Sequence, residues 1–164
     1  MKIVFLMRHA KSSWGDPTMP DHDRPLNNRG KKDAPRMGKL LKENNLIPDI
    51  IISSTARRAE MTAKRVAKSC QYPKDIIFKP SLYSAGPSAF IKELKMINED
   101  GIGSALLVGH NTGVEDFVEY LNGNIETLPT SALVQIELPI KKWNELGTKT
   151  RGKIINVWRP KQLN

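Results

Sequence analysis

Lys2-Ile3-Val4-Phe5-Leu6-Met7 is a short apolar stretch that ends abruptly at Arg8-His9. It has the length of one strand and is apolar at consecutive positions, which is typical of a strand that a parallel sheet buries on both faces. Two further stretches have the same character, Asp49 to Ser53 and Ser104 to Val108. The three stretches predict three buried parallel strands at the centre of the protein.

Segments with a helical spacing of apolar residues lie between and after these strands. Pro35 interrupts one of them, a long stretch from about Asn28 to Asn44, and predicts either a kink there or a helix that starts near Asp33. The alternation of strands and helices predicts an α/β fold, a three-layer α/β/α sandwich whose mostly parallel central sheet has helices on both faces. The apolar faces are Met37, Leu40 and Leu41; Ala59, Ala63, Val66 and Ala67; Phe90, Ile91, Leu94 and Ile97; and Val114, Phe117, Val118 and Leu121.

Further strands are expected toward the C-terminal end. Ile76 to Lys79 is a candidate for a short strand. Leu133 to Leu138 alternates as a strand does, and Ile154 to Trp158 follows as its hairpin partner, so we predict an antiparallel edge of the sheet. The segment from Trp14 to Arg24 is polar, contains two prolines and is predicted to be a loop.

The chain has 164 residues and a formal net charge of +9, from 26 Lys and Arg against 17 Asp and Glu. Its length suits one domain, predicted over residues 1–164. The single cysteine, Cys70, excludes a disulfide framework and a multi-cysteine metal site, and is predicted to be a packing residue. The first apolar stretch is too short for a signal-peptide core, and none approaches the roughly 18 residues of a membrane span. We therefore predict a cytoplasmic protein with no membrane partner.

Polar residues of related chemistry follow the three central strands. The strands end in Arg8-His9, Ser53-Ser54 and Gly109-His110-Asn111, and the helix after the second strand begins with Arg57 and Arg58. Because ligands of an open α/β sheet bind beyond the carboxyl ends of its strands, we expect these side chains to share one pocket. Each histidine alone is more often a hydrogen-bonded loop residue than a catalyst. Imidazoles beside guanidiniums nevertheless suit a phosphoryl group, because Arg holds phosphate oxygens with paired N–H donors.

The same segments resemble the motifs of the histidine phosphatase superfamily, also called phosphoglycerate mutase-like. The small SixA-type phosphohistidine phosphatases are the branch that the chain most resembles. The resemblance runs from about Lys2 to Leu121, resumes weakly at Trp158-Arg159-Pro160, and implies a phosphoglycerate mutase-like sandwich. The motifs are Leu6-Met7-Arg8-His9-Ala10-Lys11-Ser12, Arg24-Pro25-Leu26-Asn27-Asn28-Arg29-Gly30, Ser53-Ser54-Thr55-Ala56-Arg57-Arg58-Ala59-Glu60-Met61-Thr62-Ala63 and Val108-Gly109-His110-Asn111-Thr112-Gly113.

The resemblance implies a role for each matching residue. His9 would be the nucleophile that takes the phosphoryl group, Arg8 and Arg58 would bind its oxygens, and His110 would be a second, protonated histidine. Arg57 is left as a surface neighbour. The candidate catalytic residues are therefore His9, Arg8, Arg58 and His110, and the candidate substrate-binding residues are Arg24, Asn27 and Asn111.

The carboxylic proton donor of the larger family members is missing. Those members place it in the middle of the chain, whereas Pro80-Ser81-Leu82-Tyr83-Ser84-Ala85 offers none, a feature that the SixA branch shares. The resemblance thus implies a phosphatase for phosphohistidine in proteins that forms a covalent phosphohistidine on His9. Because arginines supply fixed positive charge around the transferred group, no metal or other cofactor is expected.

Other interpretations stay open at this point. A phosphatase of the same superfamily would act on a small phosphorylated substrate, and a basic module without turnover would bind a phosphorylated partner or nucleic acid. The pair His9 and His110 argues against the basic module. No nucleic-acid partner is expected, because no recognised binding motif accompanies the basic residues near Trp143 and Trp158. Asp21-His22-Asp23 is predicted to be solvated rather than a metal cluster, because adjacent residues point in different directions.

Overall fold

A computed structural model describes residues 1–99 and 101–163, with a six-stranded sheet at its centre. The strand order is β3-β2-β4-β1-β5-β6. Neighbouring strands among β1 to β4 are parallel, whereas β5 runs antiparallel to β1 and β6 antiparallel to β5. The predicted antiparallel edge is confirmed. The strands are β1 (Lys2–Arg8), β2 (Ile50–Ser53), β3 (Ile77–Phe78), β4 (Ser104–Gly109), β5 (Leu133–Leu138) and β6 (Lys153–Trp158).

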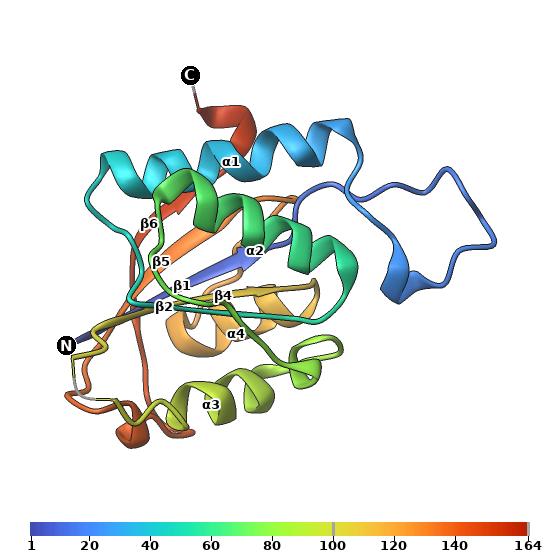
Figure 1. The fold of residues 1–164 in the computed structure, drawn as a ribbon. Coiled ribbons are helices and arrows are strands. Elements are labelled where there is room, and N and C mark those ends of the chain that lie inside the picture. The colour runs from blue at the N-terminus through green and yellow to red at the C-terminus, as the bar shows by residue number, and fades with distance from the viewer. Residues whose placement is uncertain (100, 164) are drawn as a thin grey trace.

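Helices cover both faces of the sheet (Figure 1). Successive residues of β1 point to opposite faces, so Val4 and Leu6 pack into one core while Phe5 and Met7 pack into the other. Helices α1 and α2 cover the face of Phe5, and α3 and α4 cover the face of Val4. This arrangement confirms the three-layer sandwich and explains why the first strand is apolar at every position from Ile3 to Met7. The helices are α1 (Asn28–Glu43), α2 (Arg57–Cys70), α3 (Pro87–Lys95) and α4 (Gly113–Asn122).

Helix α1 includes Pro35 but begins at Asn28. The alternative of a start near Asp33 is wrong, because Asn27 caps the helix: its side chain accepts a hydrogen bond from the Gly30 N–H at 2.9 Å. Pro35 removes one backbone donor, and the apolar contacts of Met37 and other residues of α1 with the sheet hold the helix in place. No helix within the described part of the chain is long and apolar enough to cross a membrane.

Cys70 and Trp143 are buried. Cys70 ends α2 with its side chain inside the core, as predicted. Trp143 is also buried, and its indole N–H donates to the carbonyl oxygen of Ile102 at 2.8 Å. The ring of Trp143 is therefore not available for stacking on a base.

The carboxyl ends of β1, β2 and β4 meet at one edge of the sheet. In the parallel register Arg8 lies opposite Gly109, and Ser53 lies opposite Val108. The pairing continues one residue further, because the N–H of His9 donates to the carbonyl of Gly109 at 2.9 Å and that of Ser54 to the carbonyl of Val108 at 3.0 Å. The backbone alone thus brings the residues that follow the three strands to one place.

Candidate active site

His9 follows β1, and the backbone carbonyl of the next residue, Ala10, orients its ring. Its Nδ1 lies 2.7 Å from the carbonyl oxygen of Ala10. Because a carbonyl oxygen only accepts hydrogen bonds, Nδ1 carries the proton and the lone pair is on Nε2. Burial lowers the pKa of His9 to about 4; the Ala10 hydrogen bond opposes this, and the charges of Arg58 and Arg8 add to it. His9 is therefore a neutral imidazole with a free nucleophilic nitrogen at neutral pH.

His110 follows β4, and its ring centroid lies 5.0 Å from that of His9. Its Nε2 is 2.8 Å from the Ser54 hydroxyl, which also accepts a hydrogen bond from the Ala56 N–H. Donation of the Ser54 proton to Nε2 satisfies both groups and places the His110 proton on Nδ1. This nitrogen is buried and has no partner within the described residues, so it is free to donate to a phosphoryl oxygen.

The surroundings of His110 do not favour the protonated form that was expected of it. Burial, together with the neighbouring His9 and Arg58, lowers the pKa of His110 to about 3. A buried imidazole among positive groups loses its proton because the charged form is poorly solvated there. His110 thus acts as a neutral hydrogen-bond donor.

Arg8, the last residue of β1, is hydrogen-bonded to the segment that precedes β5. Its Nη1 donates to the carbonyl of Leu128 at 3.1 Å, while its Nε is buried without a partner in the described chain. The Leu128 N–H donates to the Glu115 carboxylate at 2.6 Å, which places this carboxylate near Arg8. Burial lowers the pKa of Arg8 and Glu115 raises it, so the guanidinium keeps its charge.

Arg58 lies in the first turn of α2 and is buried, whereas its neighbour Arg57 is exposed, as predicted. Thr62, one turn later, connects this helix to the segment that follows β1. The Thr62 hydroxyl donates to the Arg58 carbonyl at 2.7 Å and accepts from the Ala10 N–H at 2.9 Å. These two bonds tie the backbone beside His9 to the turn that carries Arg58.

Asp21 contacts Arg58 through both its backbone and its side chain. Arg58 donates from Nη1 to the Asp21 carbonyl at 2.7 Å and from Nη2 to the Asp21 carboxylate at 3.0 Å. The Tyr83 hydroxyl donates to the same carboxylate oxygen at 2.5 Å. The prediction of solvent exposure is confirmed for Asp21, whose side chain is 46% exposed, although the sequence did not indicate its contact with Arg58.

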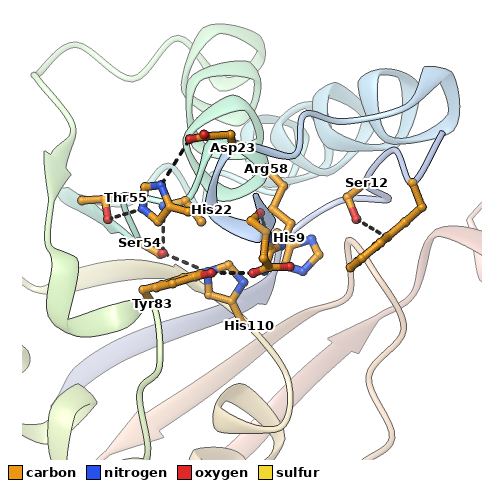
Figure 2. A network of polar contacts seen from close by, with 12 residues as sticks. His9, Ser12, His22, Asp23, Ser54, Thr55, Arg58, Tyr83 and His110 are labelled. Atoms are coloured by element: carbon orange, nitrogen blue, oxygen red, sulfur yellow. Dashed lines mark hydrogen bonds and ion pairs between the residues drawn. The ribbon is translucent and has the colours of Figure 1, made fainter. Parts of the chain in front are cut away.

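Tyr83 lies beside His110. Figure 2 shows His9, Arg58, Tyr83 and His110 turned toward one another. The Tyr83 ring meets the His110 ring edge-on, with centroids 5.5 Å apart. The loop that carries Tyr83 comes close to α4 because Gly113 has no side chain there: a Cβ on Gly113 would lie 2.1 Å from the Ala85 carbonyl oxygen.

The three candidate substrate-binding residues have mainly structural contacts. Asn27 uses its side-chain oxygen to cap α1. Arg24 donates to the carbonyl of Asp16 at 3.1 Å and lies over the Trp14 ring at 4.0 Å, so it holds the loop before α1. Asn111 donates to the Leu128 carbonyl at 3.0 Å, and its side-chain oxygen is buried without a partner among the described residues. Asn111 is thus placed beside the carbonyl that also holds Arg8.

Sequence reasoning missed Asp21, Tyr83 and Thr62 as parts of the site. Thr62 was visible as the last polar residue of the third motif. Asp21 and Tyr83 belong to two loops, and no local sequence pattern predicts that these loops contact each other. Within residues 1–99 and 101–163 no group of three or more His, Cys, Asp or Glu side chains is placed to hold a metal ion.

Two histidines and two arginines thus gather where the parallel strands β1, β2 and β4 end, an arrangement of donors and positive charge that suits a phosphoryl group. The model of the histidine phosphatase superfamily (branch 1) matches residues 4–83. An uncharacterized chloroplastic protein of Arabidopsis thaliana is 31% identical over 150 residues, which cover 87% of this chain and 69% of that protein. The chain belongs to the histidine phosphatase superfamily, and within it to the SixA-type branch.

One solved structure supports this assignment of the branch, and a second supports the fold. The protein assigned as phosphohistidine phosphatase SixA in Agrobacterium tumefaciens is 27% identical and superimposes with a TM-score of 0.82, over 97% of this chain and 98% of that one. The protein histidine phosphatase SixA complexed with tungstate superimposes with a TM-score of 0.85 over 99% of both chains. At 23% identity the latter supports the fold alone.

Proposed function

We propose that the chain, as one histidine phosphatase domain over residues 1–164, removes phosphoryl groups from phosphohistidine in proteins through a covalent intermediate on His9. The observation that carries the proposal is the state of His9: a buried, neutral imidazole whose Nδ1 is hydrogen-bonded to the Ala10 carbonyl, and whose pKa is lowered by burial and by the charges of Arg58 and Arg8. A neutral imidazole is nucleophilic, and the arginines attract the phosphoryl group that it attacks.

In the first step the Nε2 lone pair of His9 attacks phosphorus and forms a nitrogen–phosphorus bond. The bond between phosphorus and the substrate histidine breaks on the opposite side, and its electron pair returns to the leaving imidazole. This imidazole leaves neutral because its other ring nitrogen carries a proton from solvent. Arg8, Arg58 and the Nδ1–H of His110 hold the equatorial oxygens, where charge accumulates in the transition state.

In the second step water attacks the phosphorus of phospho-His9. The electron pair of the breaking bond returns to Nε2, and the proton of the water passes to phosphate or solvent. The hydrogen bond from Nδ1–H to the Ala10 carbonyl is kept throughout, so the imidazole returns to the same tautomer. Inorganic phosphate then leaves.

The protonation state of Asp21 supports an imidazole leaving group. The Tyr83 hydrogen bond, followed by Arg58, lowers the pKa of the Asp21 carboxyl. An ionised carboxylate has no proton to give to an alkoxide, although it is the acidic side chain that contacts Arg58. Phosphohistidine therefore fits the site better than an alkyl phosphate does.

The function is tested by phosphate release from a phosphohistidine peptide, from an aryl phosphate and from a sugar phosphate, beside a titration with nucleic acid. We expect turnover of the phosphohistidine peptide with the highest kcat/KM and no specific binding of nucleic acid. A preference for the sugar phosphate would favour the small-substrate alternative, and binding without turnover would favour the non-catalytic module. The cytoplasmic location stays a prediction.

The pH profile distinguishes buried from ordinary histidines. Since kcat/KM reports the free enzyme, we expect it to be flat from about pH 6 to pH 8, once the substrate's own ionisation is measured separately. It should fall only as the pH approaches the His9 pKa of about 4. A protonated His110 would instead give a bell-shaped profile across this range.

Low pH also acts on stability. The unfolded chain protonates His9 and His110 near their ordinary pKa of 6.5, whereas the folded chain resists protonation until far lower pH. The free energy of unfolding should therefore fall as the pH drops from 6.5 toward 4. Circular dichroism at each pH then separates loss of the fold from loss of kcat/KM. A ring of His9 or His110 that titrates between about pH 6 and 7 by NMR would contradict the prediction.

Metal removal should leave activity unchanged. Arg8 and Arg58 supply the positive charge that a divalent ion supplies in other phosphatases. We expect the same kcat before and after prolonged dialysis against a chelator. Loss of activity that a divalent ion restores would show that the pocket has been assigned wrongly.

A further inference from the structure

Among the residues that the structure describes, the Arg58 guanidinium is hydrogen-bonded to Asp21 alone. Both of its terminal nitrogens donate to Asp21, Nη1 to the carbonyl at 2.7 Å and Nη2 to the carboxylate at 3.0 Å. A guanidinium has five N–H groups in a planar fork, so these two bonds leave three, the one on Nε and one on each terminal nitrogen. Arg58 can thus bind Asp21 and phosphoryl oxygens at the same time.

The Asp21 carboxylate is itself fixed on the rim of the pocket. It accepts the Tyr83 hydroxyl, and the next residue, His22, is hydrogen-bonded through Nε2 to the Thr55 hydroxyl at 3.0 Å. The His22 and Tyr83 rings also meet edge-on, with centroids 4.8 Å apart. The short turn Asp21–Asp23 is therefore connected to the site by the contacts of Asp21 with Arg58 and Tyr83, and by those of His22 with Thr55 and Tyr83 (Figure 2).

We propose that Asp21 is a positioning residue, which orients the Arg58 guanidinium for the transferred phosphoryl group and is itself oriented by Tyr83. This inference rests on the proposed function of the site. The long, flexible Arg58 side chain loses conformational entropy when it is fixed. Because Asp21 already fixes the guanidinium in the folded protein, this entropy is lost on folding and not when the transition state forms.

The proposal predicts effects of opposite direction on rate and on anion binding. Without the Asp21 carboxylate, Arg58 is no longer held in the orientation that matches the transition state, so kcat falls. The same change removes a negative charge beside the phosphate position, so inorganic phosphate binds as well as before or better. A merely structural loss would weaken both.

The experiment compares four variants for kcat and for inhibition by inorganic phosphate. For Asp21→Ala we expect kcat to fall about 10- to 100-fold, the range that misplacement by about 1 Å produces. Its inhibition constant for phosphate should be equal to or below that of the wild type. Asp21→Asn keeps an acceptor oxygen and should recover part of kcat, and Tyr83→Phe should lower kcat by less than Asp21→Ala does. Asp23→Ala, in the same turn with a 65% exposed side chain, is the matched control and should behave as the wild type.

Two outcomes would overturn the positioning role. One is a kcat of Asp21→Ala within about twofold of the wild type. The other is an inhibition constant that rises as kcat falls, with no recovery in Asp21→Asn. NMR of the unliganded protein adds a test that needs no activity: hydrogen bonds to Asp21 should slow rotation of the Arg58 terminal nitrogens, and Asp21→Ala should speed it up.

Every variant is assayed with both a phosphohistidine peptide and an aryl phosphate. If the wild type hydrolyses the aryl phosphate but not the phosphohistidine peptide, the proposed substrate class fails. The ratio of variant to wild type on the aryl phosphate and the NMR result then still decide the role of Asp21. If the peptide is hydrolysed and the variants are unaffected, the positioning role alone fails.

Discussion

His9→Ala is expected to lower kcat by at least about 10⁴-fold, because the variant has no nucleophile, and loss of a nucleophile is among the largest single effects in covalent catalysis. The Ala10 backbone that pairs with the His9 ring remains, and the N–H of residue 9 still donates to Gly109, so the fold should be unchanged. The measurement is phosphate release from a phosphohistidine peptide at saturating concentration.

Labelling separates the nucleophile from the other histidine of the pocket. With a radioactive phosphoryl donor, the wild type should acquire an acid-labile label and His9→Ala should acquire none. His110→Ala should still be labelled, although more slowly, because it lacks a hydrogen-bond donor rather than the attacking atom. Thermal unfolding of each variant is the control for folding. An acid-labile label on His9→Ala would contradict the assignment of the nucleophile.

The choice of leaving group should change kcat/KM by a similarly large factor. An alkoxide must be protonated as it leaves, and a positioned acid contributes roughly 10²–10⁴-fold to that step. The Glu115 side chain accepts the Leu128 N–H, and the Asp21 carboxyl, whose pKa is lowered, is ionised on Arg58, so neither is placed to give a proton to a leaving group. We expect a phosphohistidine peptide to exceed 3-phosphoglycerate in kcat/KM by at least about 10²-fold, with aryl phosphates of acidic phenols between them.

The carboxylates near the pocket provide the control for this comparison. Asp21→Asn and Glu115→Gln are assayed with the alkyl phosphate and with the aryl phosphate. An acid that protonates the leaving group matters more for the poor leaving group, so its removal would lower only the alkyl rate. If the wild type preferred the alkyl phosphate and either variant lost that preference, the protein would act on small phosphate esters.

The strands and the main residues of the site could be predicted because the relevant physics is local. The apolar stretch before Arg8-His9 is buried on both faces, and the same is true of the stretches before Ser54 and His110. Parallel strands end at one edge of a sheet, so residues that follow them converge without further information. The start of α1 was harder to place, since Pro35 argued for a later start than the Asn27 cap allows.

The sequence by itself determined where the strands lie, which helical faces are apolar and that His9, Arg58 and His110 gather at one edge. Only the tertiary structure decided the protonation of the two histidines, because a pKa depends on the burial that the whole fold produces. It also decided the environment of Arg58. Asp21 is 37 residues from Arg58 and 62 from Tyr83 along the chain. The loops that carry these residues have no periodic pattern, so the contact among them follows from how the loops pack over the finished sheet.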